Sequence, residues 1–171
     1  PGNSLVLASG HDFINNAGAG ALVTTDPGAR WLVYSDDPRE DTKGGLVSDF
    51  KRYNRTYAGY APGAVTETDN GFLYAYQPTI TVTADDETIA FGDMPSLTYS
   101  LSGFIDGDTV GTATSGAASV TAGGTTAGTH TLTAAAGTLA SDLGYAFDYM
   151  DGILTIGEPP NTGFDLPSSY E

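Results

Sequence analysis

Short apolar runs separated by turn residues are the feature that most limits what this chain can fold into. After residue 78 the chain contains the runs TITVTADD, SLTYSLSGF, GAASVTAGG, THTLTAAAG, YAFDYMDG and ILTIG, each bounded by residues such as Gly, Asp and Ser. Apolar and polar residues alternate in these runs, as in half-buried strands. Their spacing predicts a small all-β domain. We also expect DYMDGILTI to form a hairpin with Asp151 and Gly152 at its turn.

The first 78 residues predict a different β architecture. The segment SLVLASGHDFINNAGAGALVTT alternates short apolar runs with Gly and Asn, and strands this short bury little surface unless they stack on a neighbour. Stacked coils of that kind form a parallel β-helix. Residues 29–35, ARWLVYS, predict a strand, and residues 71–78, GFLYAYQP, predict another that ends at Pro78. We therefore predict the terminal coil and cap of a parallel β-helix over residues 1–78.

The segment between these two strands allows two structures. Its apolar residues recur at spacings of four, three, four and three, which matches one face of a helix. An extended structure explains them almost equally well. The residues concerned are Leu46, Phe50, Tyr53, Tyr57 and Tyr60.

The net charge of −15 excludes nucleic acid and anionic membranes as partners, because a surface of that sign repels them. The chain has no run of 18 apolar residues, so we expect no membrane insertion. All six basic residues lie between Arg30 and Arg55. We therefore expect the carboxylates after residue 55 to be solvated, bonded to backbone N–H groups or bound to cations, and not to form salt bridges.

Residues 104–111, FIDGDTVG, place Asp106 and Asp108 where a calcium loop would begin. An EF-hand needs a third oxygen ligand two residues later and a Glu at its twelfth position, where this chain has Val110 and Ala117. We therefore predict a turn with Gly107 at positive φ. Calcium at Asp106 and Asp108 is the weaker alternative, and we expect no other cofactor.

Enzyme motifs are absent from the sequence. There is no Cys, which argues against Cys-ligated zinc, and His11 and His130 have no His or Cys neighbour. No phosphate-binding loop or nucleophile elbow occurs either. We predict that the chain is not an enzyme.

Aromatic residues offer candidates for ligand binding. Their flat faces could stack on sugar rings, but aromatic residues at strand spacing more often pack a core or cap, leaving a hydroxyl at the rim. We favour the core or cap and keep a glycan-binding platform as the alternative. The candidates are Trp31, Tyr34, Tyr53, Tyr57 and Tyr60.

Two stretches resemble known families. The N-terminal part resembles the stalk end of filamentous-haemagglutinin-type exoproteins, which are large adhesins exported by two-partner secretion. The runs that carry this resemblance are LVLASGHDFINNAGAGAL, ARWLVYSDDP, GGLVSDFKRYNRTYAGYAP and NGFLYAYQP. The MBG module of bacterial surface proteins resembles the stretch from ITVTADDETIAFGDMPSLTYSLSGFIDGDTV to DGILTIG. The MBG family usually has Tyr before the Gly of its aromatic–Gly pair, whereas this chain has Phe91 before Gly92.

These resemblances imply an all-β chain in three parts. Residues 1–78 are the β-helix end and cap, residues 79–157 a grasp-like or sandwich-like MBG module, and residues 158–171 a Pro-rich linker or tail. They imply an extracellular adhesin segment on the bacterial cell surface that serves attachment or biofilm-type adhesion. Its partner would be a host or matrix glycan or protein. The alternative is a structural spacer or filament subunit that pairs strands with copies of itself.

Overall fold

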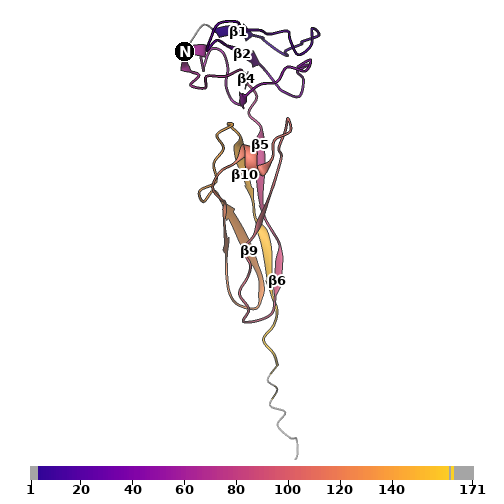
Figure 1. Ribbon diagram of the computed structural model, residues 1–171. Coiled ribbons are helices and arrows are strands. Elements are labelled where there is room, and N and C mark those ends of the chain that lie inside the picture. The colour runs from indigo at the N-terminus through magenta and orange to yellow at the C-terminus, as the bar shows by residue number, and fades with distance from the viewer. Residues whose placement is uncertain (1–3, 162, 164–171) are drawn as a thin grey trace, which may run out of the picture. The chain divides into compact units, whose positions relative to one another are not determined.

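The computed structural model describes residues 4–161 and residue 163, which fold almost entirely as β-strands (Figure 1). The strands are β1 Ser4–Ala8, β2 Arg30–Ser35, β3 Phe50–Arg52, β4 Gly71–Tyr74, β5 Thr79–Ala84, β6 Glu87–Ile89, β7 Tyr99–Ser102, β8 Ser119–Ala122, β9 Gly128–Ala135, β10 Ala146–Met150 and β11 Gly152–Ile156. Two single helical turns, η1 Pro62–Ala64 and α1 Val110–Ala113, accompany them. The predicted all-β class is confirmed. None of the helices in the described part is long and apolar enough to cross a membrane.

The chain divides into two compact units. Unit 1 comprises the described residues up to Thr81 together with residues 101–117 and 138–148. Unit 2 comprises residues 82–100, residues 118–137 and the described residues from Tyr149 on. Unit 1 therefore gathers segments from both sides of the predicted boundary after residue 78. Of the predicted tail 158–171, residues 158–161 and 163 are described and form neither helix nor strand, and the others lie outside the described residues.

Unit 1 contains a parallel sheet with the strand order β1-β2-β4-β3. All six residues of β2 are buried, which confirms the strand predicted at residues 29–35. Trp31 and Val33 face one apolar cluster, whereas Leu32 and Tyr34 face another. A strand covered on both faces needs such a continuous apolar run. The described residues show this sheet and no β-helical stalk, so the terminal coil and cap stay a prediction.

The segment from Leu46 to Tyr60 is extended, and its helical alternative is wrong. Only Phe50–Arg52 form regular structure there, as strand β3. The apolar residues do not share one face, because Leu46 and Tyr53 pack in the cluster around Trp31, while Phe50 and Tyr60 pack against the cluster around Leu32. The helix-like spacing therefore arises from two separate cores.

The larger core of unit 1 joins residues that are far apart in the sequence. Trp31, Tyr53 and Phe72 share this cluster with Ala113 and Tyr145. The last two residues come from segments 101–117 and 138–148, far beyond residue 78. The apolar surface of the N-terminal sheet is thus buried partly by residues of the predicted MBG module.

The core of unit 2 lies between two sheets. One sheet has the order β10-β5-β7 and the other has the order β6-β11-β9-β8. Ala84 of β5 packs with Leu132 of β9 and Leu154 of β11. Two sheets that share one core form a sandwich-like arrangement.

The hairpin predicted at DYMDGILTI is wrong, because β10 and β11 belong to different sheets. Neither Asp151 nor Gly152 has the positive φ that a two-residue hairpin turn requires. Gly152 serves a close backbone approach, since a Cβ added there would lie 2.4 Å from the Ala84 carbonyl oxygen. The Asp151 carboxylate accepts a hydrogen bond from the Ala134 N–H at 3.1 Å. Asp151 and Gly152 therefore mark a corner between sheets.

Candidate functional site

The predicted turn at FIDGDTVG is confirmed. Asp106 and Gly107 have φ values of 51° and 76°. The Asp108 N–H donates to the Ile105 carbonyl oxygen at 3.0 Å. Positive φ at both central residues and this hydrogen bond are the features of a type I′ turn, for which Asp-Gly is a preferred pair.

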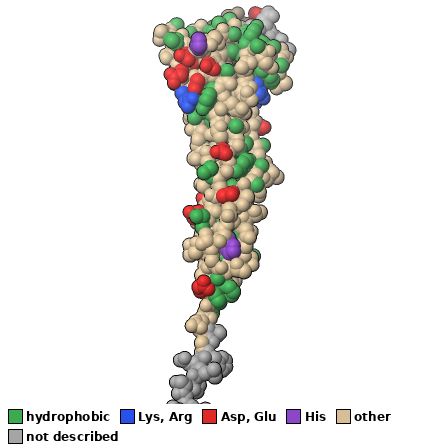
Figure 2. All heavy atoms as spheres, turned by 180° about the vertical axis from the view of Figure 1, so that it is seen from behind, with side chains coloured by type: hydrophobic (Ala, Val, Ile, Leu, Met, Phe, Trp, Pro, Cys, Tyr) green, Lys and Arg blue, Asp and Glu red, His purple; other side chains and the backbone are tan. Residues whose placement is uncertain are grey.

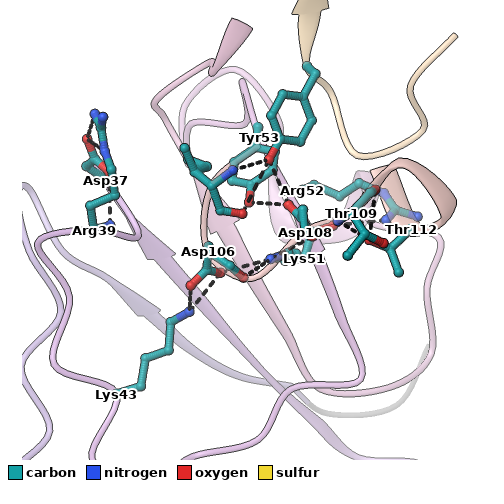
Figure 3. A network of polar contacts seen from close by, with 12 residues as sticks. Asp37, Arg39, Lys43, Lys51, Arg52, Tyr53, Asp106, Asp108, Thr109 and Thr112 are labelled. Atoms are coloured by element: carbon teal, nitrogen blue, oxygen red, sulfur yellow. Dashed lines mark hydrogen bonds and ion pairs between the residues drawn. The ribbon is translucent and has the colours of Figure 1, made fainter. Parts of the chain in front are cut away.

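Both carboxylates of the turn meet lysines from the N-terminal part of unit 1 (Figure 3). Lys43 Nζ lies 2.7 Å from Asp106 Oδ1 and 2.9 Å from its Oδ2. Lys51 Nζ bridges the two acids, at 3.0 Å from Asp106 Oδ2 and 2.9 Å from Asp108 Oδ1. The same ammonium group donates to the Asp106 carbonyl oxygen at 2.8 Å. The turn is therefore attached to the strand that carries Lys51.

Two phenols complete the surroundings of Asp108. The hydroxyls of Tyr53 and Tyr145 both donate to Asp108 Oδ2, at 2.8 and 2.9 Å. Tyr145 also accepts the Ile105 N–H at 3.0 Å, and its ring packs edge-on against Tyr53 with centroids 5.0 Å apart. The side chain of Asp108 is 5% exposed, so its charge is compensated almost entirely by these groups and Lys51.

The expectation that the late carboxylates form no salt bridges is wrong. Asp106 and Asp108 pair with Lys43 and Lys51, and Glu67 pairs with Arg52. The fold brings these acids to the basic residues of segment 43–52. Unit 2 has no Lys or Arg, and the side chains of Asp86, Glu87 and Asp151 there accept backbone N–H groups, as expected. Figure 2 shows Lys and Arg side chains next to acidic ones on the face that it displays.

A cavity of about 390 Å³ lies beside this network. Lys51, Arg52 and Asp108 line it, together with Phe50 and Leu143. The charged groups already have protein partners. Among the described residues, no group of three or more His, Cys, Asp or Glu side chains is arranged to hold a metal ion. The network is suited to holding segments together.

Calcium should leave the melting temperature unchanged, because ammonium groups already occupy the carboxylates of Asp106 and Asp108. The measurement compares thermal unfolding in millimolar calcium with unfolding in EDTA. A ligand that binds only the folded state raises its stability, so a higher melting temperature in calcium would contradict this expectation.

Alkaline pH should destabilise unit 1. Burial is the main cause that raises the pKa of Tyr145 to about 12, from an ordinary value of 10.0, and hydrogen bonding to Asp108 adds to the effect. Burial likewise raises the pKa of Tyr34 to about 12 and that of Tyr53 further. The folded state thus favours the protonated phenols, and their contribution to stability is complete below pH 10 and declines as the pH rises from 10 to 12. Phenolate absorbance during a pH titration, recorded with circular dichroism, tests this. Deprotonation of all tyrosines near pH 10 with no loss of structure would contradict it.

The structure separates the five aromatic candidates. Trp31 and Tyr53 are 3% and 0% exposed in the larger core, so their rings are not presented to solvent. Tyr34 is also buried, but it touches the other two candidates. Its ring packs edge-on against Tyr57 with centroids 5.4 Å apart, and its hydroxyl donates to the Tyr60 carbonyl oxygen at 2.9 Å. Tyr57 is 52% exposed.

Sequence reasoning missed Lys43, Lys51 and Tyr145 as members of the network. The confinement of the basic residues to positions 30–55 was the one sequence feature that pointed to Lys43 and Lys51 as partners for the later carboxylates. It indicated where compensating charge was available, but not which acids would reach it. Nothing in the local sequence distinguishes Tyr145 from other strand tyrosines.

Comparison with known proteins supports the MBG part of the chain. No curated protein and no solved structure matches the chain. The matching family is of the YGX type, and the Phe91–Gly92 pair, which resembles that pattern in the sequence, has Phe91 46% exposed and Gly92 at a φ of 91°. Residues 80–155 match the MBG domain family of the YGX type, which confirms the MBG module predicted from the sequence.

Proposed function

We propose that this chain is a non-catalytic segment of a secreted bacterial cell-surface adhesin, which serves attachment or biofilm-type adhesion. The MBG match over residues 80–155 supports the proposal, because this domain is found in surface adhesin-like proteins. The finer assignment to a filamentous-haemagglutinin-type protein exported by two-partner secretion rests on the resemblance of the first 78 residues.

The shared core of unit 1 is the observation that carries the proposal. Tyr53 and Phe72 of the N-terminal part pack in one cluster with Ala113 and Tyr145 of the MBG segment. The Tyr53 N–H donates to the Leu143 carbonyl oxygen at 2.7 Å, which adds a backbone connection. A surface protein that holds a cell against flow needs segments that do not separate under load. A common core with partly buried ion pairs provides such a junction.

The proposal includes no chemical step. The clustered carboxylates Asp106 and Asp108 are held by Lys43, Lys51 and two phenols, so none of them is free as a base or nucleophile. His130 Nε2–H donates to the Thr126 carbonyl oxygen within its own loop, at 2.7 Å. Turnover of an acidic polysaccharide by the chain would contradict this part of the proposal.

Attachment can be measured directly with the 171-residue chain. We expect it to bind a defined subset of glycans or matrix proteins on an array, and to bind as a monomer. A denatured sample on the same array is the control for non-specific adsorption. Absence of binding to any glycan or matrix protein would contradict an adhesive role.

A spacer or filament subunit is the second candidate, and the free edges of one sheet favour it. In the order β6-β11-β9-β8, the strands β6 and β8 each have one side that pairs with no other strand of the described residues. Edge strands leave N–H and C=O groups that can pair with another chain. This candidate predicts concentration-dependent fibres that disappear when residues 158–171 are deleted. A chain that stays monomeric at high concentration would exclude it.

A further inference from the structure

A second cavity in unit 1, of about 200 Å³, is distinct from the Lys–Asp–Tyr network. Four short segments of the chain surround it. They contribute Ser9, Tyr34, Asp36, Arg55 and Tyr57, among others. Drug-sized ligands usually occupy about 300–1,000 Å³, so this cavity fits a smaller group.

Arg55 differs from four of the other five basic residues of the chain. Arg39, Lys43, Lys51 and Arg52 each pair with a carboxylate. Within the described residues Arg55 has no such partner. Its Nη1 donates to the Asn54 carbonyl oxygen at 2.9 Å, and its buried Nε donates to none of the described residues. A buried donor without an acceptor costs free energy.

The guanidinium group of Arg55 is held in place although it lacks an acid. Its centre lies 4.8 Å from the ring centroid of Tyr60, within the range of a cation–π contact. The Arg55 N–H donates to the Tyr74 carbonyl oxygen at 2.8 Å, which fixes the backbone. A planar guanidinium that is positioned in advance is suited to two parallel hydrogen bonds with a carboxylate.

Two further groups at the cavity complement Arg55. The ring of Tyr57 is half-exposed and is braced edge-on by Tyr34, so it offers a fixed apolar face. The carboxylate of Asp36 has no donor among the described side chains and can accept hydrogen bonds from hydroxyl groups. Asp36 and Arg55 do not pair with each other, so each is available to a ligand.

We propose that this cavity binds a single carboxylated sugar residue. The sugar carboxylate would meet Arg55, its hydroxyl groups would donate to Asp36, and the C–H face of its ring would lie on Tyr57. An acidic peptide side chain supplies the carboxylate but neither the ring face nor the set of hydroxyls. The net charge of −15 repels polyanions, so the fitting ligand carries its one acidic sugar on an otherwise neutral chain. This inference rests on the proposed adhesive function and specifies its ligand.

The test is a titration of the ¹⁵N-labelled 171-residue chain, followed by amide chemical shifts. The probes are glucuronate, glucose, N-acetylglutamate and polygalacturonate. We expect saturable shifts around Asp36, Arg55 and Tyr57 with glucuronate. Glucose and N-acetylglutamate should each bind at least about tenfold more weakly, because each loses one set of charge-assisted or hydroxyl hydrogen bonds. Polygalacturonate should bind no better per sugar than glucuronate.

Variants locate the binding site. Arg55→Gln and Tyr57→Ala should each weaken glucuronate binding by about tenfold or more. Arg39→Gln is the matched control, because Arg39 pairs with Asp37 outside the cavity and should leave binding unchanged. Arg55→Lys keeps the charge but loses the planar donor pair, so it should bind more weakly than the wild type while it remains folded. The circular dichroism spectrum and melting curve of each variant show whether it is folded.

Three results would overturn the inference: no saturable shifts with glucuronate, equal binding by wild type and a folded Arg55→Gln or Arg55→Lys variant, or tighter binding of N-acetylglutamate than of glucuronate. The last would assign the cavity to an acidic peptide. These failures remain distinct from a failure of the adhesive function. A chain that binds the array but not glucuronate keeps its function and loses this ligand, whereas a chain that binds neither loses both.

Discussion

Asp108→Ala should lower the free energy of unfolding by about 3–5 kcal/mol, the usual cost of removing one partner from a buried ion pair. The substitution leaves the hydroxyls of Tyr53 and Tyr145 without their acceptor, and it leaves Lys51 with one carboxylate fewer. For a chain of this length the loss corresponds to a fall in melting temperature of about 6–20 °C. Thermal and urea unfolding followed by circular dichroism measure both quantities.

The control for Asp108→Ala is Asp37→Ala. Asp37 pairs with Arg39, whose side chain is 48% exposed, and exposed pairs contribute little to stability. Asp37→Ala should therefore melt close to the wild type. Asp108→Asn keeps the size and one acceptor oxygen, so its loss should be smaller than that of Asp108→Ala. Equal melting temperatures for Asp108→Ala and Asp37→Ala would contradict a stabilising role for the network.

Gly144→Ala should strongly destabilise unit 1. Gly144 has a φ of 99°, and a Cβ added there would lie 2.5 Å from the Tyr53 carbonyl oxygen. The strained backbone alone costs about 1–3 kcal/mol. The clash adds to that cost, because Tyr53 is held by its N–H bond to the Leu143 carbonyl oxygen and by its contact with Tyr145. We expect a larger loss of unfolding free energy than strain explains.

Gly28→Ala separates the two contributions. Gly28 has a φ of 75°, but a Cβ there would meet nothing within 4 Å. Its substitution therefore reports the cost of the positive φ alone, about 1–2 kcal/mol. Comparison of the two variants by urea unfolding isolates the close approach between Gly144 and Tyr53. If Gly144→Ala is no less stable than Gly28→Ala, the backbones of these two segments are not in contact.

Local pattern was enough to predict the strands but not their partners. Alternation in TITVTADD and the apolar run ARWLVYS located β5 and β2, since both signals depend only on which faces are buried. The hairpin prediction at Asp151–Gly152 was wrong because the sequence does not distinguish a Gly that permits a close backbone approach from a Gly in a tight turn. The helical alternative for Leu46 to Tyr60 was wrong because these apolar residues are divided between two separate cores.

The candidate sites show the same limit. The Asp-Gly pair predicted the turn at Asp106, because the turn depends on local backbone conformation. The lysines that approach it are 55 to 63 residues away in the sequence, a separation that no local pattern encodes. Of the five aromatic candidates, Tyr34 lies against Tyr57 and Tyr60, and a role of these residues in binding stays a prediction. Trp31 and Tyr53 looked the same in the sequence and are buried.

The central claim is that the first 78 residues and the MBG segment share one core in unit 1, and amide hydrogen exchange tests it most directly. The measurement compares residues 79–157 produced alone with the 171-residue chain. We expect residues 101–117 and 138–148 to lose most of their protection in the shorter chain, because Tyr53, Phe72 and Lys51 are missing from their surroundings. Equal protection of these two segments in both chains would contradict the claim, since the MBG module would then be stable without the residues that precede it.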